Sequence, residues 1–93
     1  MEIATLLLYH NADINKATSL GFTPLQNASI YGHVEVVTLL LWHNADIQKT
    51  NNGGNTPLHW ACDEGHLDVV NALLQAKANM FHMNNQGHTP LDM

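Results

Sequence analysis

Residues 56–66 read TPLHWACDEGH, and parts of this segment return at a fixed distance along the chain. The tripeptide TPL occurs three times, at 23–25, 56–58 and 89–91, so that its copies lie 33 positions apart. When residues 1–33 are placed over residues 34–66, 18 positions are identical. Internal similarity at a period of this length is typical of repeat proteins, in which each unit packs only on its neighbours.

Each unit predicts a pair of short helices. Threonine before proline indicates a helix start, because the hydroxyl caps free N–H groups and proline at the first helical position needs no donor. Gly32 and Gly65 indicate where this helix ends. A second helix with a wide apolar face follows over residues 34–42, and we expect left-handed ends at Asn44 and, with some strain, at Lys77. Helices this short are marginal in water, so neighbouring units must hold them.

These motifs resemble the ankyrin repeat. The likeness rests on Gly-x-Thr-Pro-Leu-His-x-Ala, then Gly-His-x-x-Val-Val-x-Leu-Leu, then Ala-Asp-Ile, and it is closest over residues 56–66. The resemblance implies an all-α solenoid of stacked antiparallel helix pairs with projecting hairpin loops. It also implies a concave face, made by loop tips and first helices, that binds other proteins. Gln26, Asp92 and residues 81–83 depart from the family pattern, which favours a natural, diverged array over an idealised one.

We expect one repeat array over residues 1–93. Its expected parts are a partial repeat at 1–17, repeats at 18–50 and 51–83, and a partial repeat at 84–93. Neither end carries a polar capping repeat, since Ile3, Leu6 and Leu7 at one end and Leu91 and Met93 at the other resemble interior residues. The chain is therefore expected either to be a segment of a longer array or to associate with another copy through its ends.

Composition excludes several function classes. The chain has 3 Lys, no Arg, 8 acidic residues and a formal charge of −5, which argues against binding nucleic acid or an anionic membrane surface. The longest apolar run, residues 39–42, is far shorter than the roughly 20 residues that span a bilayer. The single cysteine, Cys62, cannot form an internal disulfide, which indicates an intracellular protein of the cytoplasm or nucleus.

His59, Cys62 and His66 have side chains of the kinds that bind zinc or form a Cys/His nucleophile pair. A structural role is the stronger interpretation. The resemblance places both histidines where ankyrin repeats use them for hydrogen bonds between loops and repeats, and Cys62 at a small helix position. We therefore predict no catalytic residues, no metal and no cofactor. We also expect His33 and His66 to act as neutral, backbone-bonded imidazoles, so that stability falls in acid.

The resemblance also indicates which residues face a protein partner. They are Ser19, Leu20, Phe22, Ile30, Tyr31, Asn52, Asn55, Asp63, Glu64, Gln86 and His88. Leu20, Phe22, Ile30 and Tyr31 predict an apolar contact cluster, unless Phe22 packs into its own hairpin and Ile30 into the next repeat. Asp63 and Glu64 add an acidic rim, which suits a partner with an apolar anchor beside basic side chains. The predicted function is non-catalytic protein recognition; the alternative is a structural spacer within a larger protein.

Three further features carry predictions. Tyr9 and Trp42 fall on the otherwise polar stripes of the second helices, where each ring either lies flat over its own repeat or contributes to self-association. Trp60 is expected in the core. Asn15 resembles the hairpin asparagine that is hydroxylated in some ankyrin arrays, and Gln48 and Phe81 occupy the equivalent positions.

Overall fold

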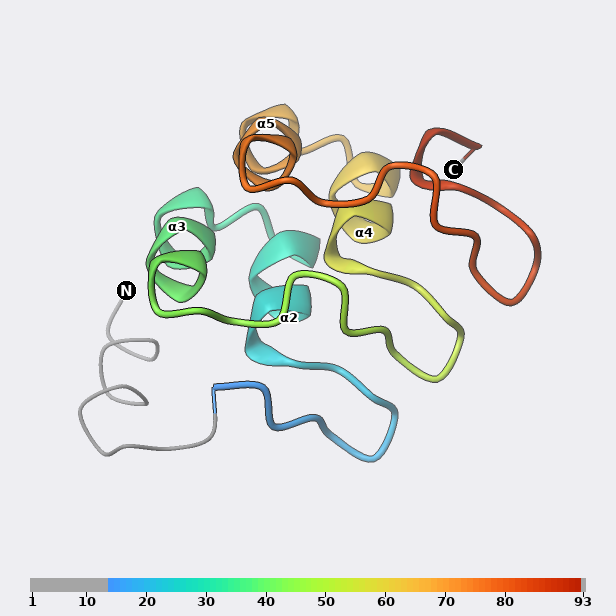
Figure 1. Ribbon diagram of the computed structural model, residues 1–93, viewed down its shortest axis with the longest axis horizontal. Coiled ribbons are helices and arrows are strands. Elements are labelled where there is room, and N and C mark those ends of the chain that lie inside the picture. Colours follow the sequence, from blue (N-terminus) through green and yellow to red (C-terminus); the bar gives the residue numbers. More distant parts are fainter. Residues whose placement is uncertain (1–13, 93) are drawn as a thin grey trace.

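The computed structural model describes residues 14–92, and the predictions for Tyr9 and for the two chain ends lie partly or wholly outside this range. Within residues 14–92, four α-helices and one 3₁₀ helix follow one another (Figure 1). They are α2 (Pro24–Ile30), α3 (Val34–Trp42), α4 (Pro57–Asp63), α5 (Leu67–Gln75) and η1 (Pro90–Asp92). Residues 14–92 form no strand, so the all-α prediction is confirmed.

The first helices α2 and α4 begin at the threonine–proline pairs. Thr23 accepts a hydrogen bond from Gln26 N at 3.2 Å, and Thr56 accepts one from His59 N at 3.3 Å. In each helix proline occupies the first turn, where backbone N–H groups have no partner within the helix, so the N–H that proline lacks costs no hydrogen bond. The cap and the proline therefore set both helix starts as the sequence predicted.

The helices stack in two parallel rows. α2 lies against α4, and α3 lies against α5, while α2 packs on α3 and α4 packs on α5 within each pair. The short η1 extends the first row by packing on α4. Figure 1 shows α5 above α3 and α4 above α2, with the loops projecting from the side of α2 and α4 that faces away from α3 and α5. The described residues thus repeat the same arrangement by translation, as the solenoid prediction requires.

Small and aliphatic residues from both rows build the core. Leu25 and Leu58 occupy equivalent positions in α2 and α4, and Leu40 and Leu73 do so in α3 and α5. Burying one such leucine contributes about 2 kcal/mol, so packing between helices supplies what their short length cannot. The buried apolar residues are Leu25, Ala28, Val37, Leu40, Ala45, Leu58, Ala61, Val69, Leu73 and Ala78.

Two second helices end in the left-handed conformation without glycine. Asn44 has φ 67° and Lys77 has φ 69°, as predicted. Asparagine tolerates this region, whereas for lysine it costs roughly 1 kcal/mol. The strain predicted for Lys77 is therefore present in the backbone.

Trp60 is less buried than expected, and Trp42 does not follow the first of its two expected arrangements. Trp60 is half-buried and sits at the surface edge of α4, with its ring 5.7 Å from that of Phe22. Trp42 is 82 % exposed, so it does not lie flat over its own repeat. Trp42 therefore extends from the outer side of α3, whereas Trp60 packs on Phe22 with its Nε1–H buried and without a hydrogen-bond partner in the described structure.

The longest described helices have nine residues. None of the helices within residues 14–92 is both long enough and apolar enough to cross a membrane.

Candidate protein-interaction face

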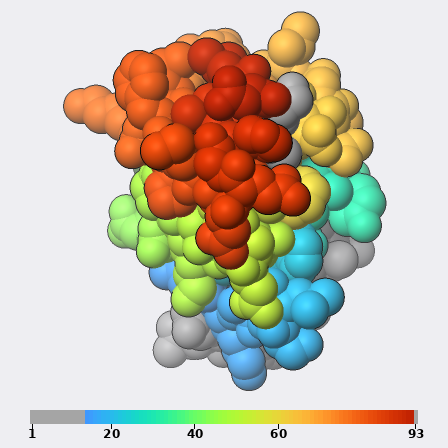
Figure 2. Space-filling view, turned by 90° about the vertical axis from the view of Figure 1, so that its right-hand side faces the viewer, coloured from blue at the N-terminus to red at the C-terminus, as the bar shows by residue number. Residues whose placement is uncertain are grey.

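Asparagine amides bind the tips of neighbouring loops together, forming what we name the loop-tip ladder. Asn52 donates from its backbone N to Leu20 O at 3.0 Å and from Nδ2 to Ser19 O at 3.1 Å. Thirty-three positions later, Asn85 donates from N to Gly53 O at 3.0 Å and from Nδ2 to Asn52 O at 3.0 Å. The same two bonds therefore join each tip to the preceding one, and Figure 2 shows the loops stacked in chain order.

A second asparagine shapes each of the two later tips from within. Asn51 Oδ1 accepts from Gly53 N and Asn55 N, both at 3.0 Å. Asn84 Oδ1 does the same for Gln86 N at 2.9 Å and His88 N at 3.0 Å, and Asn84 Nδ2 donates to Asn55 Oδ1 at 2.8 Å. These side-chain bonds add to backbone turn bonds, such as Gly54 N to Asn51 O at 3.0 Å and Gly87 N to Asn84 O at 2.9 Å, so both tips are held from within.

The predicted apolar cluster divides into exposed and half-buried members. Leu20 is 63 % exposed at a loop tip, and Tyr31 is 67 % exposed just after α2. Between them, Phe22 is half-buried against Trp60, and Ile30 is half-buried, with its carbonyl accepting from His66 Nε2 at 2.9 Å. The two exposed residues flank α2, whose seven residues span about 10 Å, so they offer two separate anchors rather than one continuous patch.

The predicted polar residues also fall into two groups. Asn52 and Asn55 are held by the bonds between tips, as donor and acceptor, so their amides already have partners. Ser19, Gln86 and His88 are exposed on the first and last described tips. Asp63 and Glu64 are exposed at the end of α4, at positions equivalent to Ile30 and Tyr31, and form no ion pair within residues 14–92.

A further row of bonds runs along the opposite turns of the repeats. Asn15 Oδ1 accepts from Asp46 N at 2.7 Å, and Gln48 Oε1 accepts from Asn79 N at 2.8 Å. At equivalent positions, the amide oxygens of asparagine and glutamine therefore accept the same hydrogen bond from the backbone of the next repeat. Phe81, at the third such position, is 75 % exposed.

His59 joins α4 to the last described loop. Its Nδ1 accepts from Thr56 N at 3.2 Å and lies 2.9 Å from Thr56 Oγ1, while Nε2 lies 2.8 Å from His88 O. Since a backbone N–H can only donate and a carbonyl can only accept, the ring is neutral with its proton on Nε2. Burial lowers the pKa of His59, the bond to His88 O opposes this, and the nearby His82 and His88 side chains lower it further.

Like His59, His66 joins two repeats through a ring nitrogen, because its Nε2 lies 2.9 Å from Ile30 O at the end of α2. Its ring passes so close to Gly32 that an added Cβ there would lie 2.6 Å from Nδ1. Gly32 also has φ 71°, so glycine is required at this position for two reasons. The predicted backbone bond is thus present for His66. His33 differs, because it is exposed and its side chain makes no hydrogen bond within residues 14–92.

The His59, Cys62 and His66 constellation does not form a site in the described structure. Ring nitrogens of both histidines are occupied by the backbone bonds given above. Burial raises the pKa of the Cys62 thiol, which makes it a poorer nucleophile. Within residues 14–92, no three His, Cys, Asp or Glu side chains come close enough to hold a metal ion.

These observations define a solenoid of helix pairs with an ordered row of loop tips. A family model described as ankyrin repeats (3 copies) matches residues 1–85. Because this match covers most of the 93 residues, the chain belongs to the ankyrin repeat family. Ankyrin repeats are generally protein–protein interaction modules and are typically non-catalytic. The comparison with curated proteins gives no match.

Sequence reasoning did not identify the loop-tip ladder. The signal was present, since the pair Asn51-Asn52 returns as Asn84-Asn85, 33 positions later. The family resemblance indicated Asn52 and Asn55 only as possible partner contacts, whereas the geometry shows that the amides of the ladder satisfy the backbone of the neighbouring loop.

Proposed function

We propose that this chain recognises a protein partner across its first helices and loop tips. The observation that carries the proposal is the loop-tip ladder, which holds the tips in a fixed relative position before any partner arrives. A surface that is already ordered loses little conformational entropy on binding. Flexible loops of the same composition would lose more and bind more weakly.

The side chains on this face favour a particular kind of partner. Leu20 and Tyr31 supply two exposed apolar anchors, and tyrosine is enriched among residues that dominate interface energies. Asp63 and Glu64 supply negative charge nearby without internal ion pairs among the described residues. A segment that carries apolar side chains next to lysine or arginine complements this arrangement.

A display library of random peptides, selected against the 93-residue chain, tests the proposal. The expected binders combine apolar residues with lysine or arginine. Changing both Leu20→Ser and Tyr31→Ala should weaken them by at least about tenfold, or 1.4 kcal/mol, without changing the circular dichroism spectrum. The charge change Asp63→Asn with Glu64→Gln should weaken basic binders several-fold more at low salt than at high salt.

The matched control is Phe81→Ala, which removes an equally exposed ring from another part of the molecule. It should leave affinity unchanged. If the Leu20/Tyr31 variant binds as well as the original chain, this face is not the recognition surface. Failure to select any binder would favour the alternative of a structural spacer.

A further inference from the structure

The outward stripe of α3 differs from that of α5, although the two helices occupy equivalent places in the fold. On α5 the stripe consists of Asp68, Asn71 and Gln75, which are all polar and exposed. On α3 the corresponding residues are Glu35, Thr38 and Trp42. Trp42 is the most exposed large apolar side chain described, at 82 %. An indole in this setting requires an explanation that the helix stacking does not give.

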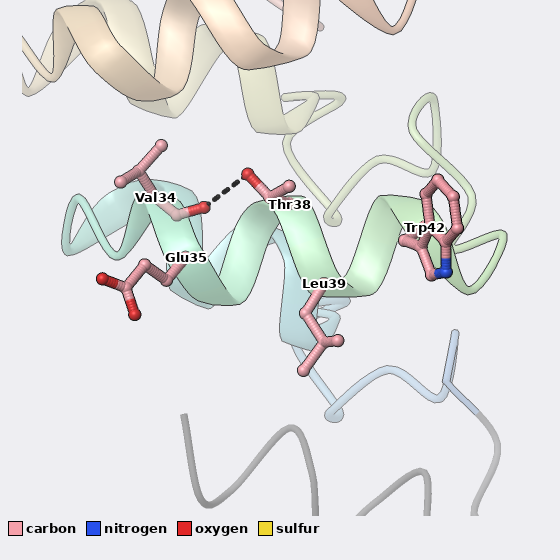
Figure 3. Close-up of a pocket in the computed structure, with 5 residues that line it drawn as sticks. All are labelled: Val34, Glu35, Thr38, Leu39 and Trp42. Atoms are coloured by element: carbon pink, nitrogen blue, oxygen red, sulfur yellow. Dashed lines mark hydrogen bonds between the residues drawn. The ribbon is translucent and has the colours of Figure 1, made fainter.

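An open groove runs along this stripe. Among described residues it is lined by Val34, Glu35, Thr38, Leu39 and Trp42, and Figure 3 places Glu35 and Trp42 at its two ends. The hydroxyl of Thr38 is already bonded to Val34 O at 2.8 Å, so the middle of the groove offers mainly apolar surface. The groove is therefore apolar between one acidic end and one aromatic end.

The polar atoms at its two ends are complementary to each other. Indole Nε1–H can only donate a hydrogen bond, and an ionised carboxylate can only accept. Neither Trp42 nor Glu35 makes a side-chain bond or ion pair within residues 14–92. They are seven residues apart, or about 10 Å along the helix axis, so the two groups cannot meet within one α3.

We propose that α3 pairs with α3 of a second copy of this chain, in antiparallel orientation about a two-fold axis near Thr38 and Leu39. This arrangement puts Trp42 of each copy over Val34 and Glu35 of the other. Each indole covers the apolar groove, and each Nε1–H meets a carboxylate, so one contact is made twice, as an isologous interface requires. The pairing is independent of the face proposed for partner recognition.

The contact is small because it uses one stripe of a nine-residue helix on each side. Interfaces well below about 1,200 Å² are weak, so we expect a dissociation constant on the order of 100 µM. Sedimentation equilibrium of the full chain should give a mass of 10.3 kDa when dilute and approach twice this mass at millimolar concentration. In NMR spectra, the Trp42 indole Hε1 resonance should shift with concentration, whereas that of the buried Trp60 Nε1–H should not.

The decisive variant is Trp42→Gln, which introduces the residue that α5 carries at the same place. Because Trp42 is exposed, the fold should persist, and the chain should remain a monomer at every concentration. Glu35→Gln keeps the size of the side chain but removes its charge, so association should weaken several-fold. Phe81→Ala is the control and should associate like the original chain.

Three outcomes would overturn the proposal. They are a monomeric mass for the original chain up to millimolar concentration, undiminished association of Trp42→Gln, and association that Phe81→Ala abolishes. The last result would place the contact at the C-terminal end of the stack instead.

Discussion

The first helices α2 and α4 share a cap and a backbone conformation but differ at the third helical residue. Gln26 and His59 are both fully buried there. His59 uses both ring nitrogens, whereas Gln26 donates from Nε2 to Gly21 O and Lys49 O and leaves Oε1 without a partner within the described structure. A buried acceptor without a partner costs about 1–3 kcal/mol, so the same position is better satisfied in α4 than in α2.

The two side chains also respond differently to acid. His59 can take up a proton, and doing so would remove the acceptor that Thr56 N needs. Gln26 cannot titrate. At the equivalent place in the third unit, Asp92 Oδ2 accepts from Thr89 N at 2.9 Å, and this bond lowers the pKa of Asp92. Three chemically different residues therefore occupy this place. His59 and Asp92 accept from the backbone N–H of the capping threonine, Gln26 does not, and only the imidazole becomes unsuited to its place in mild acid.

The largest expected difference between the two helices concerns the glycines that follow them. Gly32→Ala should lower the free energy of unfolding by about 3 kcal/mol for two reasons. The new Cβ would collide with the His66 ring, and alanine is disfavoured at the positive φ of this position. Gly65→Ala has the same φ but no atom within 4 Å of its Cβ, so it should cost about 1 kcal/mol. Urea unfolding of both variants measures the difference. Equal losses would mean that the His66 ring moves aside freely.

The next effect is the pH dependence of α4. Since the folded state holds His59 at a lowered pKa, the unfolded chain binds more protons just below the ordinary value of 6.5. Stability is therefore complete above that pH and is lost as the pH falls through it. Thermal melts between about pH 7.5 and pH 5 should show this decline, and it should be smaller in His59→Gln, which copies the residue of α2. An unchanged decline in that variant would assign the acid sensitivity to other histidines.

A smaller effect is expected from making α2 resemble α4. Gln26→His should raise the free energy of unfolding at neutral pH by about 1 kcal/mol, because the ring supplies an acceptor at the cap and removes the unpaired Oε1. The same variant should unfold more readily in acid than the original chain. A loss of stability at neutral pH would show that the hydrogen bonds from the Gln26 amide to Gly21 O and Lys49 O contribute more stability than an acceptor at the cap.

The smallest difference is expected at the ends of α3 and α5. Lys77→Asn should stabilise the chain by about 0.5 kcal/mol, since asparagine adopts positive φ with less strain. Asn44→Lys should cost a similar amount. Chemical denaturation measures the free energy of unfolding of both variants, and each serves as the control for the other. If both variants gained stability, or both lost it, the backbone explanation would be contradicted.

The helix pairs, their caps and the left-handed residues could be predicted from sequence because each depends on local chemistry that recurs every 33 positions. Thr56 and Asn44 illustrate this, since their conformations follow from their own residue types. The left-handed conformation of Lys77 follows from its place in the repeat, 33 positions after Asn44, and goes against the preference of lysine. The places of Trp60 and Trp42 could not be predicted in this way. Their environments depend on which residues from neighbouring units surround them. The repeat pattern constrains the small residues at helix contacts more strongly than the large residues on the outer side of the helices.

The candidate site was predictable only in outline. Family resemblance indicated loops whose tips the structure stacks in a row, but it did not distinguish Asn52, whose amide binds the neighbouring loop, from Gln86, which is exposed. That distinction depends on hydrogen bonds between residues 33 positions apart, which residue types alone do not reveal. The proposed anchors Leu20 and Tyr31 remain predictions for the binding experiments.

The asparagine bonds between loop tips also restrict how the length of this protein can vary. Most surface loops accept inserted residues readily. Here an insertion within a tip, such as one directly before Asn52, would move its amide away from the carbonyls it binds, and the displaced tip would lose its bonds to its neighbour. Extra residues are therefore better tolerated in whole units of 33 than singly at the tips.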